Sequence, residues 1–137
     1  MIMYGFTTTL TGVGFDQALE KTIAALKAEG FGVLSDIDVQ AAMKEKLGVE
    51  MPRYRILGAC NPPLAHQALQ AVPDIGLLLP CNVIVREAKS GEMVVGFLDP
   101  QIMVGLVGHA DIQAVADAAQ QRLRRACASL GGTPASD

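Results

Sequence analysis

The most informative segment for the fold is residues 81–98, which have the sequence CNVIVREAKSGEMVVGFL. Two apolar runs rich in β-branched residues, 81–87 and 92–98, flank the step Ser90-Gly91, a pair typical of a tight turn. The segment therefore predicts a β-hairpin with antiparallel strands. If the turn has two residues, paired positions sum to 181, which places Asn82 opposite Asp99 and Cys81 opposite Pro100.

Outside this hairpin the spacing of apolar residues alternates between a strand period and a helix period. Strands are predicted at 2–10, 31–37 and 53–59, and helices at 15–29, 39–47, 62–71 and 112–130. Asp38, Asn61 and Asp111 are the expected helix caps, and 101–108 is expected to be a flexible apolar stretch. The order β-α-β-(α)-β-α-β-β-α predicts an α+β fold. Its architecture would be a two-layer sandwich, with a mostly antiparallel sheet of about five strands and helices on one face.

Length and composition limit the classes of protein that this chain can belong to. The 137 residues suffice for one domain, expected at 1–130, and the small polar tail 131–137 is expected to fray. A net charge of -3 and 4% aromatic residues argue against a nucleic-acid partner.

No window reaches the roughly 18 apolar residues that a membrane span requires. The N-terminal segment also lacks the basic leader of a signal peptide. A cytoplasmic, reducing location is therefore expected, with Cys60, Cys81 and Cys127 as free thiols.

The predicted topology brings polar groups together at one edge of the sheet. If the strand at 53–59 runs antiparallel to the strand that begins at Cys81, the end of the first lies beside the start of the second. Cys60-Asn61, Cys81-Asn82, Asp99 and the start of the helix at Pro62 then converge, with Met103 close behind. A helix N-terminus lowers the pKa of a nearby thiol, so Cys60 is a candidate thiolate. The alternative is that Asn61 is only a cap, Asn82 a strand-edge residue and both cysteines buried small hydrophobes.

Metal and cofactor sites have weaker support. Twenty residues separate Cys60 from Cys81, without the Cys-x-x-Cys knuckle of a structural zinc site, so no metal ligands are assigned. His109, in a glycine-flanked stretch, could reach the cleft as a ligand or an acid/base group. Met103 with a thiolate or with His109 could form a soft-metal or haem-type ligand pair, so the cofactor stays unknown. Phosphate-loop, nucleophile-elbow and dinucleotide-binding motifs are absent from the sequence.

Three sequence blocks resemble a known family. They are YRILGACNP at 54–62, LLLPCNV at 77–83, and Asp99-Pro100-x-x-Met103. In this order they resemble the domain-of-unknown-function 302 family from about Phe6 to Leu130. The resemblance implies a small α+β domain similar to the TATA-binding-protein-like arrangement, a tendency to form homodimers, and no established reaction. Its signature residues map to Cys60, Asn61, Pro62, Pro80, Cys81, Asn82, Asp99, Pro100 and Met103.

Three hypotheses about function follow. The first is a homodimeric binding or sensing domain with a small ligand in the cleft. The second is a thiol redox protein in which Cys60 attacks and Cys81 resolves, so that these two are the candidate catalytic residues. The third is a structural or interaction module with inert cysteines. The candidate ligand-binding residues are Cys60, Asn61, Pro62, Pro80, Cys81, Asn82, Asp99, Met103 and His109.

Overall fold

The computed structural model of the chain describes residues 2–134. Its elements follow the predicted order, with three additions, namely η1, α4 and a two-residue strand near the end. They are β1 (Gly5–Leu10), α1 (Phe15–Ala28), β2 (Gly32–Asp38), α2 (Val39–Leu47), β3 (Tyr54–Cys60), α3 (Pro62–Ala71), the 3-10 helix η1 (Pro73–Leu78), β4 (Cys81–Glu87), β5 (Met93–Leu98), α4 (Gln101–Val107), α5 (Ala110–Ser129) and β6 (Thr133–Pro134).

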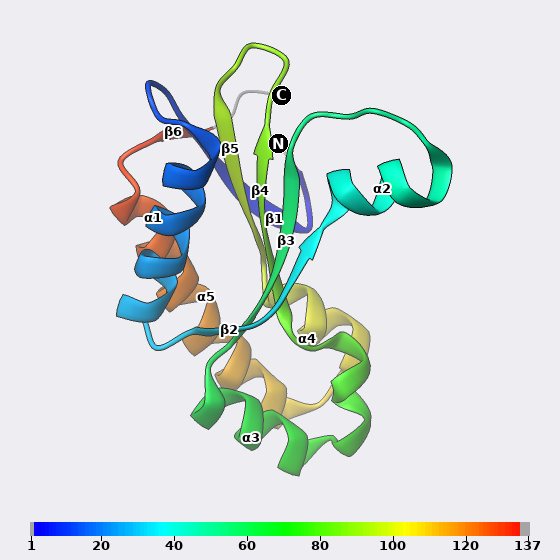
Figure 1. Cartoon of the computed structure of the whole chain (residues 1–137). Helices are drawn as coiled ribbons and strands as arrows, with labels where there is room; N and C mark the ends of the chain where they lie inside the picture. The colour runs from blue at the N-terminus through cyan, green and yellow to red at the C-terminus, as the bar shows by residue number, and fades with distance from the viewer. Residues whose placement is uncertain (1, 135–137) are drawn as a thin grey trace.

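The strands form one antiparallel sheet in the order β2-β3-β4-β5-β1-β6. Helices α1 and α5 cover one face of it, and α3 and α4 lie beyond one end (Figure 1). The predicted α+β class, the antiparallel sheet and the order of strands and helices along the chain are confirmed. Among residues 2–134, no helix is both long and apolar enough to cross a membrane.

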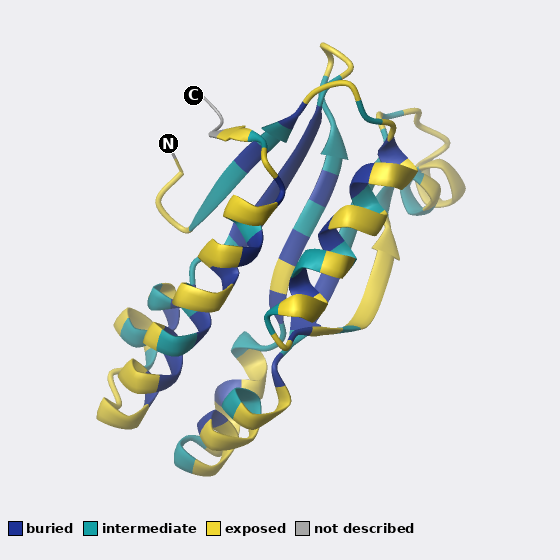
Figure 2. Cartoon of the chain, turned by 90° about the vertical axis from the view of Figure 1, so that its left-hand side faces the viewer, coloured by how far each residue is buried: buried dark blue, intermediate teal, exposed yellow. Residues whose placement is uncertain are grey.

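The main core lies between the sheet and the two long helices. Alternate residues of β4 and β5, such as Val83, Val85 and Val95, face α1 and α5 and are fully buried. Figure 2 shows the same pattern, with the buried residues of both helices on the side that meets the sheet. A second, smaller cluster joins α3, η1, α4 and the start of α5 through Ala68, Ile75, Met103, Ile112 and Val115. Helix α5 belongs to both clusters, so it connects the sheet to the helical end of the molecule.

The other face of the sheet carries no covering layer. Helix α2 stands on this side of the molecule, near the end of β2 (Figure 1). None of its residues is buried, and the same is true of β2. Asp38 caps α2 as predicted, through a hydrogen bond from the Ala41 amide to its carboxylate at 2.9 Å. We call residues 32–52, which comprise β2, α2 and the following loop, the arm.

The hairpin register differs from the prediction by one residue. Pairs between β4 and β5 sum to 180, as in Val83 with Phe97. The reason is a three-residue loop: the Ala88 amide donates to the Glu92 carbonyl, and Gly91 closes the loop at φ 88°. A left-handed glycine in third place is typical of three-residue hairpin loops. Asn82 therefore does not lie opposite Asp99, contrary to the prediction.

Two further expectations are corrected near the C-terminus. The stretch at 101–108 is mostly helix α4, because its apolar residues pack against α5 rather than remaining free. Helix α5 begins before the predicted cap, and His109 caps it by accepting a hydrogen bond from the Asp111 amide at 3.1 Å. In the tail, Thr133–Pro134 pairs with β1, while 135–137 lie outside the described residues.

Candidate functional site

A pocket of about 280 Å³ opens where β3 ends and β4 begins. Its walls come from both strand ends, from α3 and η1 on one side, and from α4 and α5 on the other. The lining residues are Phe31, Leu34, Ala59, Cys60, Asn61, Leu64, Ala65, Ala68, Leu69, Gly76, Leu79, Pro80, Cys81, Met103, Val115 and Ala119. The site is thus at the sheet edge that the sequence predicted, between the two hydrophobic clusters.

The lining is almost entirely apolar and carries no charged side chain. Its polar exception is Asn61, which is only 8% exposed. The Asn61 Oδ1 accepts a hydrogen bond from the Leu64 amide at 3.3 Å and so caps α3, as predicted. The Asn61 Nδ2 lies against Gly30, where an added Cβ would come within 3.0 Å of it. Asn61 therefore joins the start of α3 to the turn between α1 and β2.

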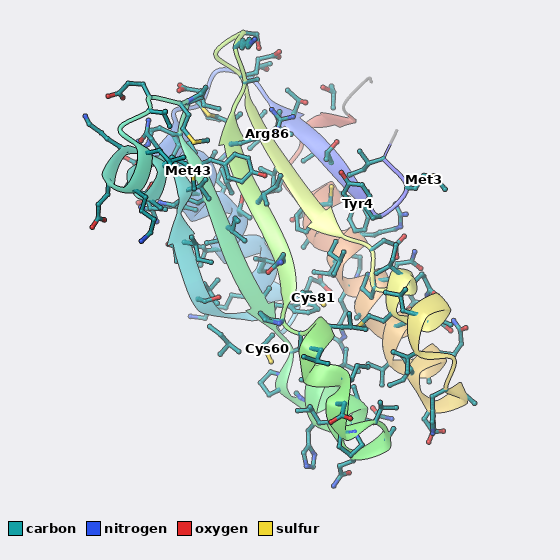
Figure 3. All side chains as sticks on the ribbon, turned by 90° about the vertical axis from the view of Figure 1, so that its right-hand side faces the viewer. Met3, Tyr4, Met43, Cys60, Cys81 and Arg86 are labelled. Atoms are coloured by element: carbon teal, nitrogen blue, oxygen red, sulfur yellow. The ribbon has the colours of Figure 1, made fainter. Side chains whose placement is uncertain are left out.

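The two pocket cysteines differ in their surroundings. Cys81 is 6% exposed, and burial, with a smaller contribution from the neighbouring Cys60 charge, raises its pKa from 9.0 to about 11. Cys60 is half-buried at the last position of β3. Both lie at the same end of the sheet (Figure 3). At neutral pH the Cys81 side chain is a protonated thiol, which can donate a hydrogen bond but is a poor nucleophile.

The strand register separates the directions of these two thiols. Ala59 pairs directly with Cys81, so these two residues share the sheet face that meets the helices. Cys60 is the next residue along β3 and leaves the strand on the opposite side. The pocket reaches both thiols because it lies beyond the strand ends rather than over one face.

Two more predicted site residues border the pocket. Met103, on α4, is 2% exposed and contributes a thioether to the wall. Pro80 precedes β4 and packs on Gly58, where an added Cβ would lie 2.7 Å from the proline Cγ. Met103 and Pro80 thus help to shape the wall without adding charge.

The remaining predicted residues lie outside the pocket lining. Pro62 is exposed in the first turn of α3, and Asn82 is exposed on the uncovered face, because neighbouring residues of a strand face opposite sides and Cys81 faces the helices. Asp99 instead accepts hydrogen bonds from the Gln101 amide and from Gln120 Nε2, at 3.0 and 3.1 Å. Asp99 therefore links β5 to α4 and α5.

His109 is also placed away from the pocket. It is exposed, and its Nδ1 is occupied as the cap of α5. Met103 lines the pocket together with Cys60 and Cys81, whereas His109 is not a lining residue, so of the two suggested ligand pairs only Met103 with a thiolate shares the pocket. Among residues 2–134, no group of three or more His, Cys, Asp or Glu side chains is placed to hold a metal ion.

The residues that the sequence reasoning missed are the apolar ones. Ala65 and Ala68 on α3 face Val115 and Ala119 on α5 across the pocket. Short side chains at these facing positions leave the space that forms the pocket. The available signal was the number of alanines on the apolar stripes of two helices, but pairing these stripes requires the tertiary arrangement.

Comparisons with known proteins agree with this fold. A family model described as "Domain of unknown function DUF302" matches residues 6–130. The crystal structure of an uncharacterized conserved DUF302 protein from Bacillus stearothermophilus is 28% identical, with a TM-score of 0.83, and the match covers 93% of this chain and 98% of that one. An uncharacterized protein of Aquifex aeolicus (strain VF5) is 24% identical over 106 residues, which are 77% of this chain and 67% of the relative.

Proposed function

Because the chain belongs to the DUF302 family, whose description assigns no activity, we propose a function from the pocket itself: the protein binds a small, uncharged, largely apolar ligand at the Cys60/Cys81 edge of the sheet. The observation that carries this proposal is the apolar lining. A charged ligand would lose its hydration in the pocket and find no counter-charge there. Apart from the two thiols, the polar side chain in the wall is Asn61, which already caps a helix.

The size of the pocket limits the ligand. Small-molecule sites usually measure about 300–1,000 Å³, so this pocket lies at the lower end. One water molecule takes up about 30 Å³ of liquid, so 280 Å³ accommodates on the order of ten non-hydrogen atoms. A short aliphatic chain or a single substituted ring fits this limit.

The thiols give the pocket its few polar contacts. Cys81 can offer an S–H to a ligand carbonyl or hydroxyl, since its raised pKa keeps it protonated. Cys60 is the more accessible of the two thiols and lies beside exposed Leu34 and Leu69. These rim residues extend the apolar surface outwards, which favours an apolar ligand at the entrance as well.

Thiol redox chemistry is the second candidate function, since two cysteines border one pocket. A disulfide requires Cβ atoms that face each other at about 3.5–4.5 Å, whereas Cys60 and Cys81 leave the sheet on opposite sides. The protonated Cys81 is also a slow partner in exchange. The geometry therefore supports binding better. A loss of two hydrogens from the intact mass after mild oxidation, abolished by Cys81→Ser, would reverse this preference.

The binding experiment is isothermal titration calorimetry with 1-octanol as the probe, a short aliphatic chain within the size limit of the pocket. Ala65 is half-buried in the pocket wall, so Ala65→Phe fills the pocket with little disturbance of the core. We expect wild type to bind the probe with micromolar affinity and Ala65→Phe to bind at least tenfold more weakly.

The matched control is Ala114→Phe, which adds the same side chain at an exposed position of α5 and should bind like wild type. Equal binding by Ala65→Phe and wild type, or no binding by folded wild type, would contradict the proposal.

We also infer that the chain forms a homodimer in a reducing, cytoplasmic setting. The homodimer is supported by the family resemblance and by the apolar side chains that are exposed on the arm and on the uncovered face of the sheet. Native mass spectrometry of gently purified protein measures the oligomer and reports any retained ligand, metal or haem in the same spectrum.

A further inference from the structure

The beginning of α3, which borders the pocket, has no free amide for a ligand. Its first two residues are Pro62 and Pro63, which have no N–H. The Leu64 amide donates to Asn61 Oδ1 at 3.3 Å, and the Ala65 amide donates to the Asn61 carbonyl at 2.9 Å. A helix N-terminus binds anions through such amides when they are free. A ligand carboxylate or phosphate therefore finds no donor at this end of the helix.

The pocket wall contains a buried hydrogen-bond donor that has no partner. Cys81 lines the pocket and is 6% exposed. Its thiol makes no hydrogen bond with residues 2–134. A thiol is a weak donor, and a buried donor without an acceptor costs free energy. A neutral acceptor on the ligand, such as a carbonyl oxygen, would satisfy it.

The second thiol of the pocket is more accessible. Cys60 is half-buried at the end of β3, next to the start of α3 (Figure 3). It leaves the sheet on the side opposite to Cys81, so a ligand can lie between the two sulfur atoms. Thiols are the side chains that add most readily to electrophilic carbon atoms. The pocket thus combines a nucleophile with a neutral hydrogen-bond donor, in apolar surroundings.

We propose that the ligand of this pocket is a small α,β-unsaturated aldehyde or ketone, which Cys60 captures covalently while the Cys81 thiol donates a hydrogen bond to its carbonyl oxygen. The inference rests on the proposed function and names the class of ligand. The reactive β-carbon and the carbonyl oxygen are the two ends of one conjugated unit, so each can meet a different thiol. The ligand is uncharged, as the apolar lining and the closed start of α3 require.

The addition needs neither an oxidant nor a reductant. The Cys60 sulfur forms a bond to the β-carbon, and the π bond between the α- and β-carbons breaks as its electrons move towards the carbonyl oxygen. The proton that Cys60 loses is finally placed on the α-carbon, which restores the carbonyl group. The thioether product contains every atom of the thiol and the ligand. Cys81 keeps its own proton throughout, because its burial disfavours a thiolate.

The experiment compares 2-octenal with 2-butenal, which has the same reactive group and little of the chain. Each aldehyde is incubated with an excess of the whole protein, and peptide mapping by mass spectrometry assigns the adducts. Cys127 is the internal reference, since it is also half-buried but lies outside the pocket lining. We expect the ratio of Cys60 to Cys127 adducts to be about tenfold higher with 2-octenal, because the pocket holds its chain beside the Cys60 sulfur.

Three variants test the parts of the proposal, with circular dichroism to show that each is folded. Ala65→Phe fills the pocket and should lower the 2-octenal ratio to the value for 2-butenal, whereas Ala114→Phe on the exposed side of α5 should not change it. Cys81→Ala should slow the addition of 2-octenal to Cys60 about fivefold, the equivalent of one hydrogen bond.

The outcomes separate this inference from the proposed function. If 1-octanol binds in calorimetry but the adduct ratio is equal for the two aldehydes, or is unchanged in Ala65→Phe, covalent capture is overturned and the binding function stands. If neither 1-octanol binding nor a difference between the aldehydes is found, both are overturned. An undiminished rate in folded Cys81→Ala would overturn the hydrogen bond to the carbonyl oxygen.

Discussion

At Cys81, burial has a larger effect on the chemistry than any neighbouring charge. The thiol faces the main core between β4 and the helices, and its pKa of about 11 reflects the cost of a thiolate in an apolar environment. Cys127 shows the same direction, since burial raises its pKa while the Arg124 charge opposes the shift. Both are therefore protonated under ordinary conditions, and Cys60 is the thiol that alkylating reagents should reach first.

The raised pKa of Cys81 predicts a loss of stability in alkali. A thiol with a pKa of 9.0 in the unfolded chain and about 11 in the folded one stabilises the fold fully below pH 9. This contribution, about 3 kcal/mol, is lost as the pH rises from 9 to 11. Urea unfolding at pH 8 and pH 11 should therefore show a smaller decrease for Cys81→Ala than for wild type. Parallel decreases in the two proteins would contradict the assignment.

At the scale of elements, α3 forms one pocket wall and depends on its N-cap. Asn61 accepts a hydrogen bond from the Leu64 amide and contacts the turn at Gly30, where φ is +83°. Asn61 therefore couples the position of α3 to the turn that leads into β2. The same residue that the sequence suggested as a ligand contact acts here as a positioning residue for the wall.

We predict that Asn61→Ala lowers the unfolding free energy by about 1 kcal/mol, the usual cost of losing an N-cap. Asn61→Ser, which can still cap the helix, should recover most of this loss. Urea denaturation measures both changes in stability, and calorimetric titration with 1-octanol shows whether the pocket wall moves. If serine destabilises as much as alanine, the contact of Asn61 with Gly30 matters more than the cap.

At the scale of the whole molecule, the pocket lies at the boundary between a large and a small cluster. Seventeen buried residues form the main cluster, and five form the second. Leu64 packs against both clusters and also lines the pocket. Regions with few buried apolar contacts open at lower free energy than the rest of a domain. The helical end formed by α3, η1 and α4 is therefore the less stable part.

Ligand binding should stabilise this end selectively. We predict that hydrogen exchange of amides in α3 and α4 is faster than in β4 and β5, and that saturating 1-octanol slows exchange in α3 and α4. At 100 times its dissociation constant a ligand adds about 2.7 kcal/mol to any opening that releases it. Hydrogen-exchange mass spectrometry measures both effects. If 1-octanol slowed exchange equally in the sheet and in α3, or did not slow exchange in α3 at all, the result would contradict a ligand in this pocket.

Short-range patterns allowed most of the elements to be predicted. The hairpin at 81–98, the caps at Asp38 and Asn61, and the apolar stripe of the last helix depend on neighbours within a few residues, so the sequence itself indicates them. The meeting of Cys60 and Asn61 with Cys81 at one sheet edge could also be expected from antiparallel pairing of their strands, whereas the place of Met103 in the pocket wall depends on α4, which the sequence did not predict.

What the tertiary structure decided depends on contacts between distant segments. The hairpin loop is the local exception, because three loop residues instead of two moved Asn82 out of register with Asp99, while strand alternation turned it away from Cys81. The α4 helix and the pocket wall with its alanines exist because particular helix faces meet. Local spacing determines which face of an element is apolar, whereas the packing of the whole chain determines what that face contacts.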